Sequence, residues 1–276
     1  VPVSLTRCRF MASHMLDAKP VLPVAMYIEW FAHAALHENP GLRFTGLQNL
    51  RVFKGVILDS SESRTLEFHA GKPVKTPDGA YRVDVEMRAG NVLHAGTTIL
   101  LAQTLPKPGE ATADRFAHGP YANNGYYDGG QLFHGPDFRA LDSVDGCDAS
   151  GIEVRARTAP RPADWIEKPL RKAWIAEPLV IDCAFQALIL WTHHQHGSGS
   201  LPVRIGRYTQ YANTFPKGHV IIRASVKEHT DHKAIANVDF VNPRTGALVA
   251  RMEDYECVID ASLNQAFQRS ALTFAK

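Results

Sequence analysis

The sequence lacks the features that would place it outside the cell, in a membrane or on a nucleic acid. Its 276 residues include four cysteines, which stand far apart without a CxxC pair, so neither a zinc ribbon nor a disulfide framework is expected. The formal net charge is only +2, too small an excess for electrostatic binding of nucleic acid. The most apolar stretch, 22–36, contains Glu29 and His33 and is shorter than the ~20 residues of a membrane span. A reducing, cytoplasmic compartment is therefore expected.

Motifs of several large enzyme classes are also missing. No GxSxG, Walker or GxGxxG pattern occurs, which leaves serine hydrolases and nucleotide-dependent enzymes without support. The histidines at 193, 194 and 196 favour an exposed helix end over a metal site, because positive charge suits the negative end of the helix dipole. The chain starts at Val1 without a signal-peptide pattern, and we expect it to be a piece of a longer protein.

The composition is that of a folded protein, with 45% hydrophobic and 21% charged residues. One order of predicted elements, a helix followed by strands, occurs twice. Two segments, 22–37 and 178–194, are apolar on nearly all sides and predict helices that must be enclosed by protein. Each is followed by strand-like segments separated by turn residues. These segments are 47–52, 64–70, 81–88 and 93–102 after the first helix, and 203–211, 219–228, 234–242 and 247–254 after the second.

This order predicts an α+β fold in which each helix is wrapped by a curved antiparallel sheet, the layout called a double hotdog. We expect an N-terminal hotdog lobe over residues 1–103 and a C-terminal hotdog lobe over residues 120–276. The segment 104–119 between them is rich in proline, glycine, alanine and charge, which is typical of a linker.

Asp182 and Gln186 are the strongly polar residues inside the second predicted helix, and their spacing of four places them on one face. Burial of an unpaired carboxyl group raises its pKa, which favours the neutral acid that can donate a proton. Two structural alternatives stay open for Asp182. It could cap a helix that starts one residue later, or be held by a hydrogen bond in the core.

His14 stands just before the first predicted helix, and Pro20 and Pro23 stiffen the chain that joins them. An imidazole with an ordinary pKa near 6.5 is well suited to accept a proton at neutral pH. The alternative is a surface or packing histidine, since the chain contains 13 of them. A third segment, 131–138, combines aromatic residues with a Gly-Pro turn and by itself indicates a loop leading into a strand over 138–144.

Taken together, these three segments resemble the motifs of polyketide synthase dehydratase domains, in the order that the family has. Residues 14–23 resemble its HxxxGxxxxP motif, residues 131–138 its GxxYGPxF motif with Gly135, Pro136 and Phe138 in place, and residues 182–186 match its DxxxQ motif. The resemblance implies the double hotdog fold and the removal of water from a β-hydroxyacyl thioester on an acyl carrier protein, within polyketide or related fatty acid biosynthesis. It implies no metal or nucleotide cofactor. The substrate would be carried on the phosphopantetheine of the acyl carrier protein.

The resemblance also implies a role for each matched residue. His14 would be the base that removes the α-proton, Asp182 the acid that protonates the leaving β-hydroxyl group, and Gln186 the residue that orients Asp182. Charge that develops on the thioester oxygen needs donors already in place. The N–H groups of Ala18 and of the helix start after Pro23 are the expected donors.

The sequence departs from the family pattern at three positions. Ala18 and Gln131 stand where the motifs have glycine, and His134 stands where they have tyrosine. His134 could donate a hydrogen bond in place of the tyrosine, or change the substrate preference. Two other functions stay open: a product template domain that directs aldol cyclisation, and a degenerate domain that binds an acyl chain or scaffolds its neighbours. Neighbouring synthase domains and a homodimeric partner are further expectations from the family.

Overall fold

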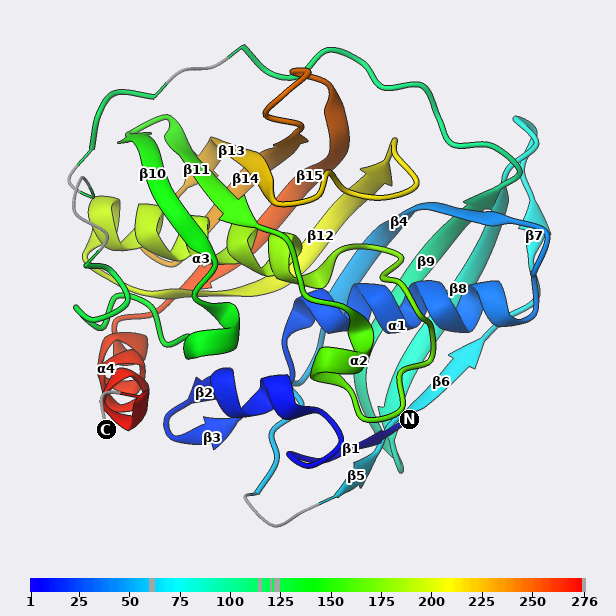
Figure 1. The fold of residues 1–276 in the computed structure, drawn as a ribbon, viewed down its shortest axis with the longest axis horizontal. Coiled ribbons are helices and arrows are strands. Elements are labelled where there is room, and N and C mark those ends of the chain that lie inside the picture. The colour runs from blue at the N-terminus through cyan, green and yellow to red at the C-terminus, as the bar shows by residue number, and fades with distance from the viewer. Residues whose placement is uncertain (60–62, 114–115, 120, 122–124, 275–276) are drawn as a thin grey trace.

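Two almost wholly buried helices, α1 (Val24–His37) and α3 (Pro178–His196), form the centre of the protein (Figure 1). The computed structural model describes residues 1–59, 63–113, 116–119, 121 and 125–274. Both helices lack a continuous polar face, so each must be covered by other elements. The two predicted helices are confirmed, with ends shifted by two residues. Pro23 has an extended backbone and precedes α1, and the left-handed Gly197 ends α3.

One antiparallel sheet of eleven strands curves around both helices (Figure 1). The strands that belong with α1 are β4 (Arg43–Val52), β6 (Glu67–Ala70), β7 (Val74–Lys75), β8 (Tyr81–Ala89) and β9 (Val92–Ala102). Those that belong with α3 are β10 (Leu141–Asp148), β11 (Gly151–Arg157), β12 (Ser200–Gln210), β13 (His219–His229), β14 (Lys233–Val241) and β15 (Leu248–Ile259). The sheet order is β10-β11-β13-β14-β15-β12-β4-β9-β8-β6, with β7 paired to β8.

The two lobes join edge to edge where β4 pairs antiparallel with β12. Leu50 lies opposite Ile205 in this pairing, and both side chains are buried on the face toward the helices. Strand β8 shows the alternation of a half-buried strand, since Val83, Val85 and Met87 are buried and the residues between them are exposed. The predicted double hotdog fold is therefore confirmed.

Several boundaries differ from the prediction. The strand predicted over 64–70 is divided into β5 (Arg64–Thr65) and β6. The prediction of a strand that starts at residue 138 was wrong, because β10 begins only at Leu141. Residues 136–138 form a 3-10 turn instead, η2 (Pro136–Phe138), in which proline sets the backbone angle.

Several other short elements were not predicted from the sequence. They are β1 (Pro2–Val3), η1 (Arg9–Ser13), β2 (Met15–Leu16), β3 (Lys19–Pro20), α2 (Pro162–Trp165) and α4 (Ser262–Phe274). Strands β10 and β11 also precede α3, so the C-terminal lobe is not a simple helix followed by strands. Among the described helices, none combines the length and hydropathy needed to span a bilayer.

The predicted linker, 104–119, contains no helix or strand among its described residues. It runs along the C-terminal lobe and is tied to it: the N–H of Thr112 donates to Asp239 at 2.7 Å, and the carbonyl oxygen of Ala117 accepts the N–H of Cys147 at 2.8 Å. The division of the chain at this segment stays a prediction.

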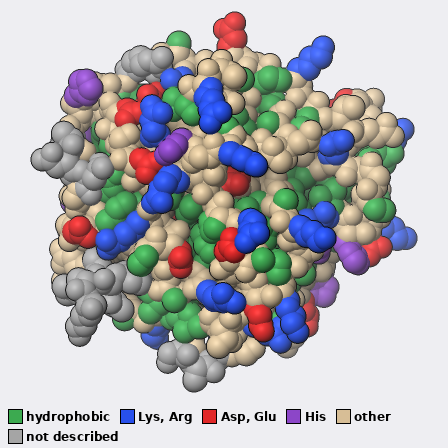
Figure 2. All heavy atoms as spheres, viewed as in Figure 1, with side chains coloured by type: hydrophobic (Ala, Val, Ile, Leu, Met, Phe, Trp, Pro, Cys, Tyr) green, Lys and Arg blue, Asp and Glu red, His purple; other side chains and the backbone are tan. Residues whose placement is uncertain are grey.

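The surface carries no large area of one charge on the face shown in Figure 2, where basic and acidic side chains alternate with apolar ones. This distribution agrees with the small formal net charge. All four cysteines are buried and free, as expected for a chain that uses no disulfide.

A buried carboxylate links α1 to the segment that leads into α3. The side chain of Glu29 accepts the N–H groups of Ile175 and Ala176 at 2.9 Å each. Burial raises the pKa of Glu29 to about 7, and these N–H groups offset part of that effect. Glu177, one residue further on, has its pKa raised to about 7 by burial as well.

These groups predict a protein that loses stability as the pH rises through about 7. A carboxyl group whose folded pKa lies above its ordinary 4.5 favours folding at low pH, and this contribution is lost between pH 4.5 and about 7, where the group is ionised in the unfolded chain but still protonated in the folded one. For Glu29 the loss is about 3 kcal/mol between pH 5 and pH 8. We expect Glu29→Gln to flatten the pH dependence of the unfolding free energy, measured by urea denaturation. An equal pH slope in both proteins would contradict this assignment.

Candidate active site

An apolar cavity of about 270 Å³ brings residues of both lobes together. Its walls come from α1, from the first half of α3 and from the chain before and after these helices. Phe185 and Ile189, which follow Asp182 on one face of α3, line it together with Leu22 and Phe133. The segment 53–55 also lines the cavity and is exposed to solvent. The cavity is thus an apolar space with an open end, suited to an extended hydrophobic chain.

His14 faces this cavity from the chain between η1 and the β2–β3 hairpin. Its Nδ1 lies 2.7 Å from the carbonyl oxygen of Val21. A carbonyl only accepts, so Nδ1 carries the proton and Nε2 is left with a lone pair. Burial lowers the pKa of His14 to about 4, against an opposing effect of Asp182. At neutral pH His14 is therefore an uncharged imidazole whose Nε2 can accept a proton.

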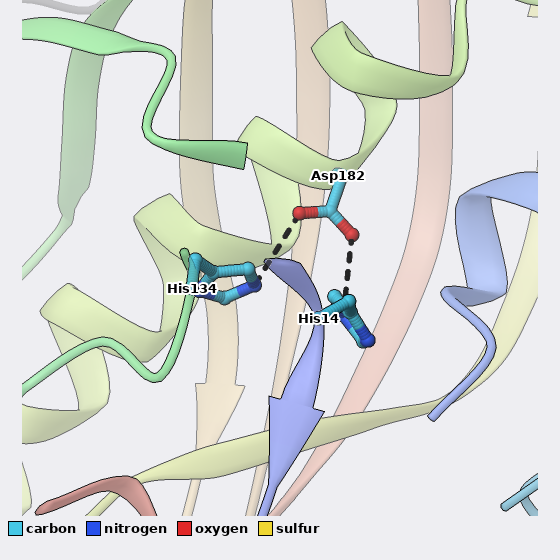
Figure 3. Close-up of side chains that lie close together, drawn as sticks. All are labelled: His14, His134 and Asp182. Atoms are coloured by element: carbon cyan, nitrogen blue, oxygen red, sulfur yellow. Dashed lines mark ion pairs between the residues drawn. The ribbon is translucent and has the colours of Figure 1, made fainter. Parts of the chain in front are cut away.

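Asp182 lies inside α3, since the helix begins at Pro178, so the capping alternative is wrong. Each of its carboxylate oxygens faces a different imidazole (Figure 3). Oδ1 is 3.8 Å from Nε2 of His14, and Oδ2 is 3.4 Å from Nε2 of His134. The side chain is only 2% exposed. The structure therefore brings His14, His134 and Asp182 into one cluster at the cavity wall.

The expectation that burial alone keeps Asp182 neutral was wrong. Burial does act to raise the pKa of Asp182, but the polar contact and charge of His134, followed by smaller effects of His14 and Gln186, hold it below its ordinary value. The sequence shows no partner for this carboxyl group, whereas in the fold His134 supplies one that favours the ionised form.

Gln186 lies on the same face of α3 as Asp182, as its spacing predicted, and bonds to it. Its Nε2 donates to Oδ2 of Asp182 at 2.8 Å and to the carbonyl oxygen of Phe138 at 3.0 Å. Its Oε1 accepts the hydroxyl group of Tyr127 at 2.8 Å. Tyr127 was not predicted, because it lies outside the motifs and nothing in its local sequence separates it from a packing tyrosine. Since every polar atom of the Gln186 amide is used, the orientation of Asp182 is fixed.

The loop with His134 is joined to the loop with His14 by backbone contacts. The two residues form an isolated antiparallel bridge, and the N–H of Gly135 donates to the carbonyl oxygen of Ser13 at 2.7 Å. The Ser13 hydroxyl also donates to Asp137 at 2.8 Å. These bonds set the separation of the two imidazoles.

The matched residues around His134 serve to build this loop. Gly135 and Pro136 start the η2 turn, and the buried Phe138 lies with its ring centre 5.2 Å from that of His14. Phe133 stacks on His134 at 4.0 Å. The segment therefore forms an aromatic wall behind the two histidines.

Two residues expected near the reacting oxygen are placed differently. Ala18 lies at the exposed tip of the β2–β3 hairpin, with φ of 58°, and is not among the residues that line the cavity. The family glycine suits this left-handed backbone better than alanine does. Pro23 precedes α1, and Val24, the first residue of the helix, lines the cavity. Of the two expected sources of N–H donors, only the start of α1 lies at the cavity.

Together, the fold and the site define a double hotdog protein with an acid–base cluster on an apolar cavity. A family model described as "Polyketide synthase dehydratase N-terminal domain" matches residues 114–260, more than half of the chain. The chain therefore belongs to the polyketide synthase dehydratase family.

Curated and solved proteins agree with this assignment. The chain is 28% identical over 209 residues to a polyunsaturated fatty acid synthase polypeptide of Thraustochytrium sp. (strain ATCC 26185 / S-3), covering 73% of this chain and 7% of that protein. The dehydratase domain from the CurF module of curacin polyketide synthase superposes with a TM-score of 0.73 at 15% identity, over 94% of this chain and 91% of that one.

A second solved structure is the dehydratase domain of a mycocerosic acid synthase-like polyketide synthase. It has a TM-score of 0.70 and 19% identity, and the match covers 93% of this chain and 89% of that one. At these identities the structural likeness concerns the fold.

Proposed function

We propose that this domain removes water from a β-hydroxyacyl group carried on the phosphopantetheine of an acyl carrier protein, with His14 as the base and Asp182 as the acid. The observation that carries the proposal is the position of both side chains at one apolar cavity, with His14 Nε2 3.8 Å from Asp182 Oδ1. The acyl chain would lie along Phe185 and Ile189 and exclude water from the reacting atoms.

His14 would take the α-proton on Nε2. Its Nδ1 proton is held by the carbonyl oxygen of Val21, which stabilises the imidazolium as it forms. The negative charge that develops on the thioester oxygen needs N–H donors. The first turn of α1 supplies them, because the N–H groups at a helix start have no partner within the helix and Val24 borders the cavity.

Asp182 would deliver the proton to the leaving β-hydroxyl group, so that water departs. Because the pKa of Asp182 is lowered, chiefly by His134 against the effect of burial, we assign the stored proton to the Asp182–His134 pair and not to the carboxyl group alone. In this proposal His134 replaces the tyrosine of the family motif as the partner of the acid.

The proposal includes partners but no metal or nucleotide for the dehydration itself. An acyl carrier protein would present the substrate, and neighbouring synthase domains would lie in the same polypeptide, since the chain spans only 7% of the length of its curated relative. We also propose a cytoplasmic location, which four free cysteines suit, and a homodimer as the assembly.

The test is turnover of 3-hydroxyacyl pantetheine thioesters of increasing chain length, followed by mass spectrometry of the product. We expect loss of one water to give the α,β-enoyl thioester, and hydration of that product in the reverse direction. The matched control is the acyl thioester without the β-hydroxyl group, which should not react. No turnover of any hydroxyacyl thioester would favour a scaffold, and cyclisation of a poly-β-keto thioester would favour a product template domain.

Replacing Gln186 should reduce turnover less than replacing the reacting residues does. Gln186→Ala removes a hydrogen bond that orients Asp182 but leaves both reacting groups present, so we expect kcat to fall by about 10-fold to 100-fold with little change in KM. Gln186→Leu, which fills the same space, controls for the cavity that alanine creates. A loss as complete as that of an Asp182 variant would mean that Gln186 takes part directly.

A further inference from the structure

His134 adds a third donor to the two residues that carry the proposed reaction. One ligand atom from each of His14, His134 and Asp182 lies within 4.8 Å of the others, and all three residues are buried. Figure 3 shows each carboxylate oxygen of Asp182 facing one of the two imidazoles. This is the only such group of three or more histidine, cysteine or acidic residues found over the described part of the chain.

The separations suit a zinc ion. Zinc binds nitrogen and oxygen at about 2.0–2.2 Å, so ligands at two corners of a tetrahedron lie about 3.4 Å apart. Nε2 of His134 is 3.4 Å from Oδ2 of Asp182, and Nε2 of His14 is 3.8 Å from Oδ1. Shifts of a few tenths of an ångström would therefore bring the donors around one ion.

Two of the three donors, His14 and Asp182, are oriented by hydrogen bonds to neighbouring groups, as metal ligands usually are. The Nδ1–H of His14 is bonded to the Val21 carbonyl oxygen, which leaves the lone pair on Nε2, the atom 3.8 Å from Oδ1 of Asp182. Asp182 is oriented by Gln186, which is itself bonded to Tyr127. Such outer bonds are typical of residues that bind a metal.

His134 differs from the other two donors in its surroundings. Its Nδ1 is buried and has no hydrogen-bond partner among the described residues. The proposed ligand atom of His134 is the other ring nitrogen, Nε2, which lies 3.4 Å from Oδ2 of Asp182, so a small movement of the ring toward an ion would break no hydrogen bond at Nδ1. The unused nitrogen marks a polar group that the protein alone does not satisfy.

We propose that His14, His134 and Asp182 bind one Zn²⁺ ion, with the fourth position open to the cavity, and that the bound ion inhibits the domain. Two imidazoles and a carboxylate with an open position form a ligand set that zinc accepts. The lone pair of His14 Nε2 cannot bind zinc and accept an α-proton at the same time. The inhibition rests on the proposed function, whereas the binding itself does not.

The binding is tested without substrate, by calorimetric titration of the metal-free protein with Zn²⁺ and by the visible absorption of bound Co²⁺. We expect one ion per chain, and at least about 100-fold weaker binding in His134→Tyr, which restores the tyrosine of the family motif, and in His134→Phe. His196→Ala is the control for histidines elsewhere and should bind as the unchanged protein does. Circular dichroism would show that the variants are folded.

Two results would overturn the site: no binding of Zn²⁺ by the unchanged protein at micromolar concentration, or equal binding by a folded His134→Tyr. If both His134 variants fail to fold, Asp182→Asn provides the same comparison. In a second assay, Zn²⁺ should inhibit turnover and a chelator should restore it. Binding without any turnover would leave the site standing and remove the proposed function, and turnover without binding would do the reverse.

Discussion

Replacing His14 by alanine is expected to lower kcat/KM for dehydration by about 10²-fold to 10⁴-fold, the range that a positioned general base contributes. The substitution removes the uncharged imidazole whose Nε2 lies 3.8 Å from Oδ1 of Asp182 at the cavity wall. Initial rates of enoyl thioester formation from a 3-hydroxyacyl pantetheine thioester measure the effect.

The control for this variant is His69→Ala, because His69 is exposed on β6 and does not line the cavity. It should keep the full rate, and thermal unfolding should show that both variants are folded. A folded His14→Ala protein with nearly normal turnover would remove His14 from the role of base.

The second large effect is expected from Asp182→Asn. Asparagine keeps the shape of the side chain and can still bond to Gln186, but it has no acidic proton to give to the leaving hydroxyl group. We expect kcat to fall by about 10²-fold to 10⁴-fold, with a smaller change in KM, because the cavity wall is unchanged. The same initial-rate assay at saturating substrate measures this loss.

Asp128→Asn is the matched control, since Asp128 is an exposed partner of Arg139. It should behave as the unchanged protein does. A folded Asp182→Asn protein that keeps most of its kcat would mean that another group, such as His134, protonates the leaving group without the carboxylate.

The helices and most strands could be predicted because their signals are local. An apolar segment without a polar face must be enclosed, as α1 and α3 are, and the alternation in β8 follows from the geometry of a strand. The start of β10 was missed because Pro136 begins a 3-10 turn, and the N–H of Gly135, just before that turn, bonds to the carbonyl oxygen of the distant Ser13. That contact crosses a long stretch of chain and leaves no local pattern.

The sequence predicted which residues of the candidate site lie together better than it predicted their pKa values. The motifs pointed to His14, Asp182 and Gln186, and the low pKa of His14 follows from burial. The lowered pKa of Asp182 depends on the contact with His134, which no sequence spacing gives. Tyr127 was missed for the same reason. Ala18 was misplaced because β2 and β3 pair with each other and leave residues 17–18 at the exposed tip of their hairpin.

The central claim is that His14 and Asp182 act on one substrate in one cavity, and the double variant His14→Ala/Asp182→Asn tests it most directly. Residues that act as a unit have effects that do not multiply. All three variants are assayed with the same 3-hydroxyacyl pantetheine thioester. We predict that the rate of the double variant lies within a few-fold of the rate of the slower single variant. A loss equal to the product of the two single losses would contradict the account.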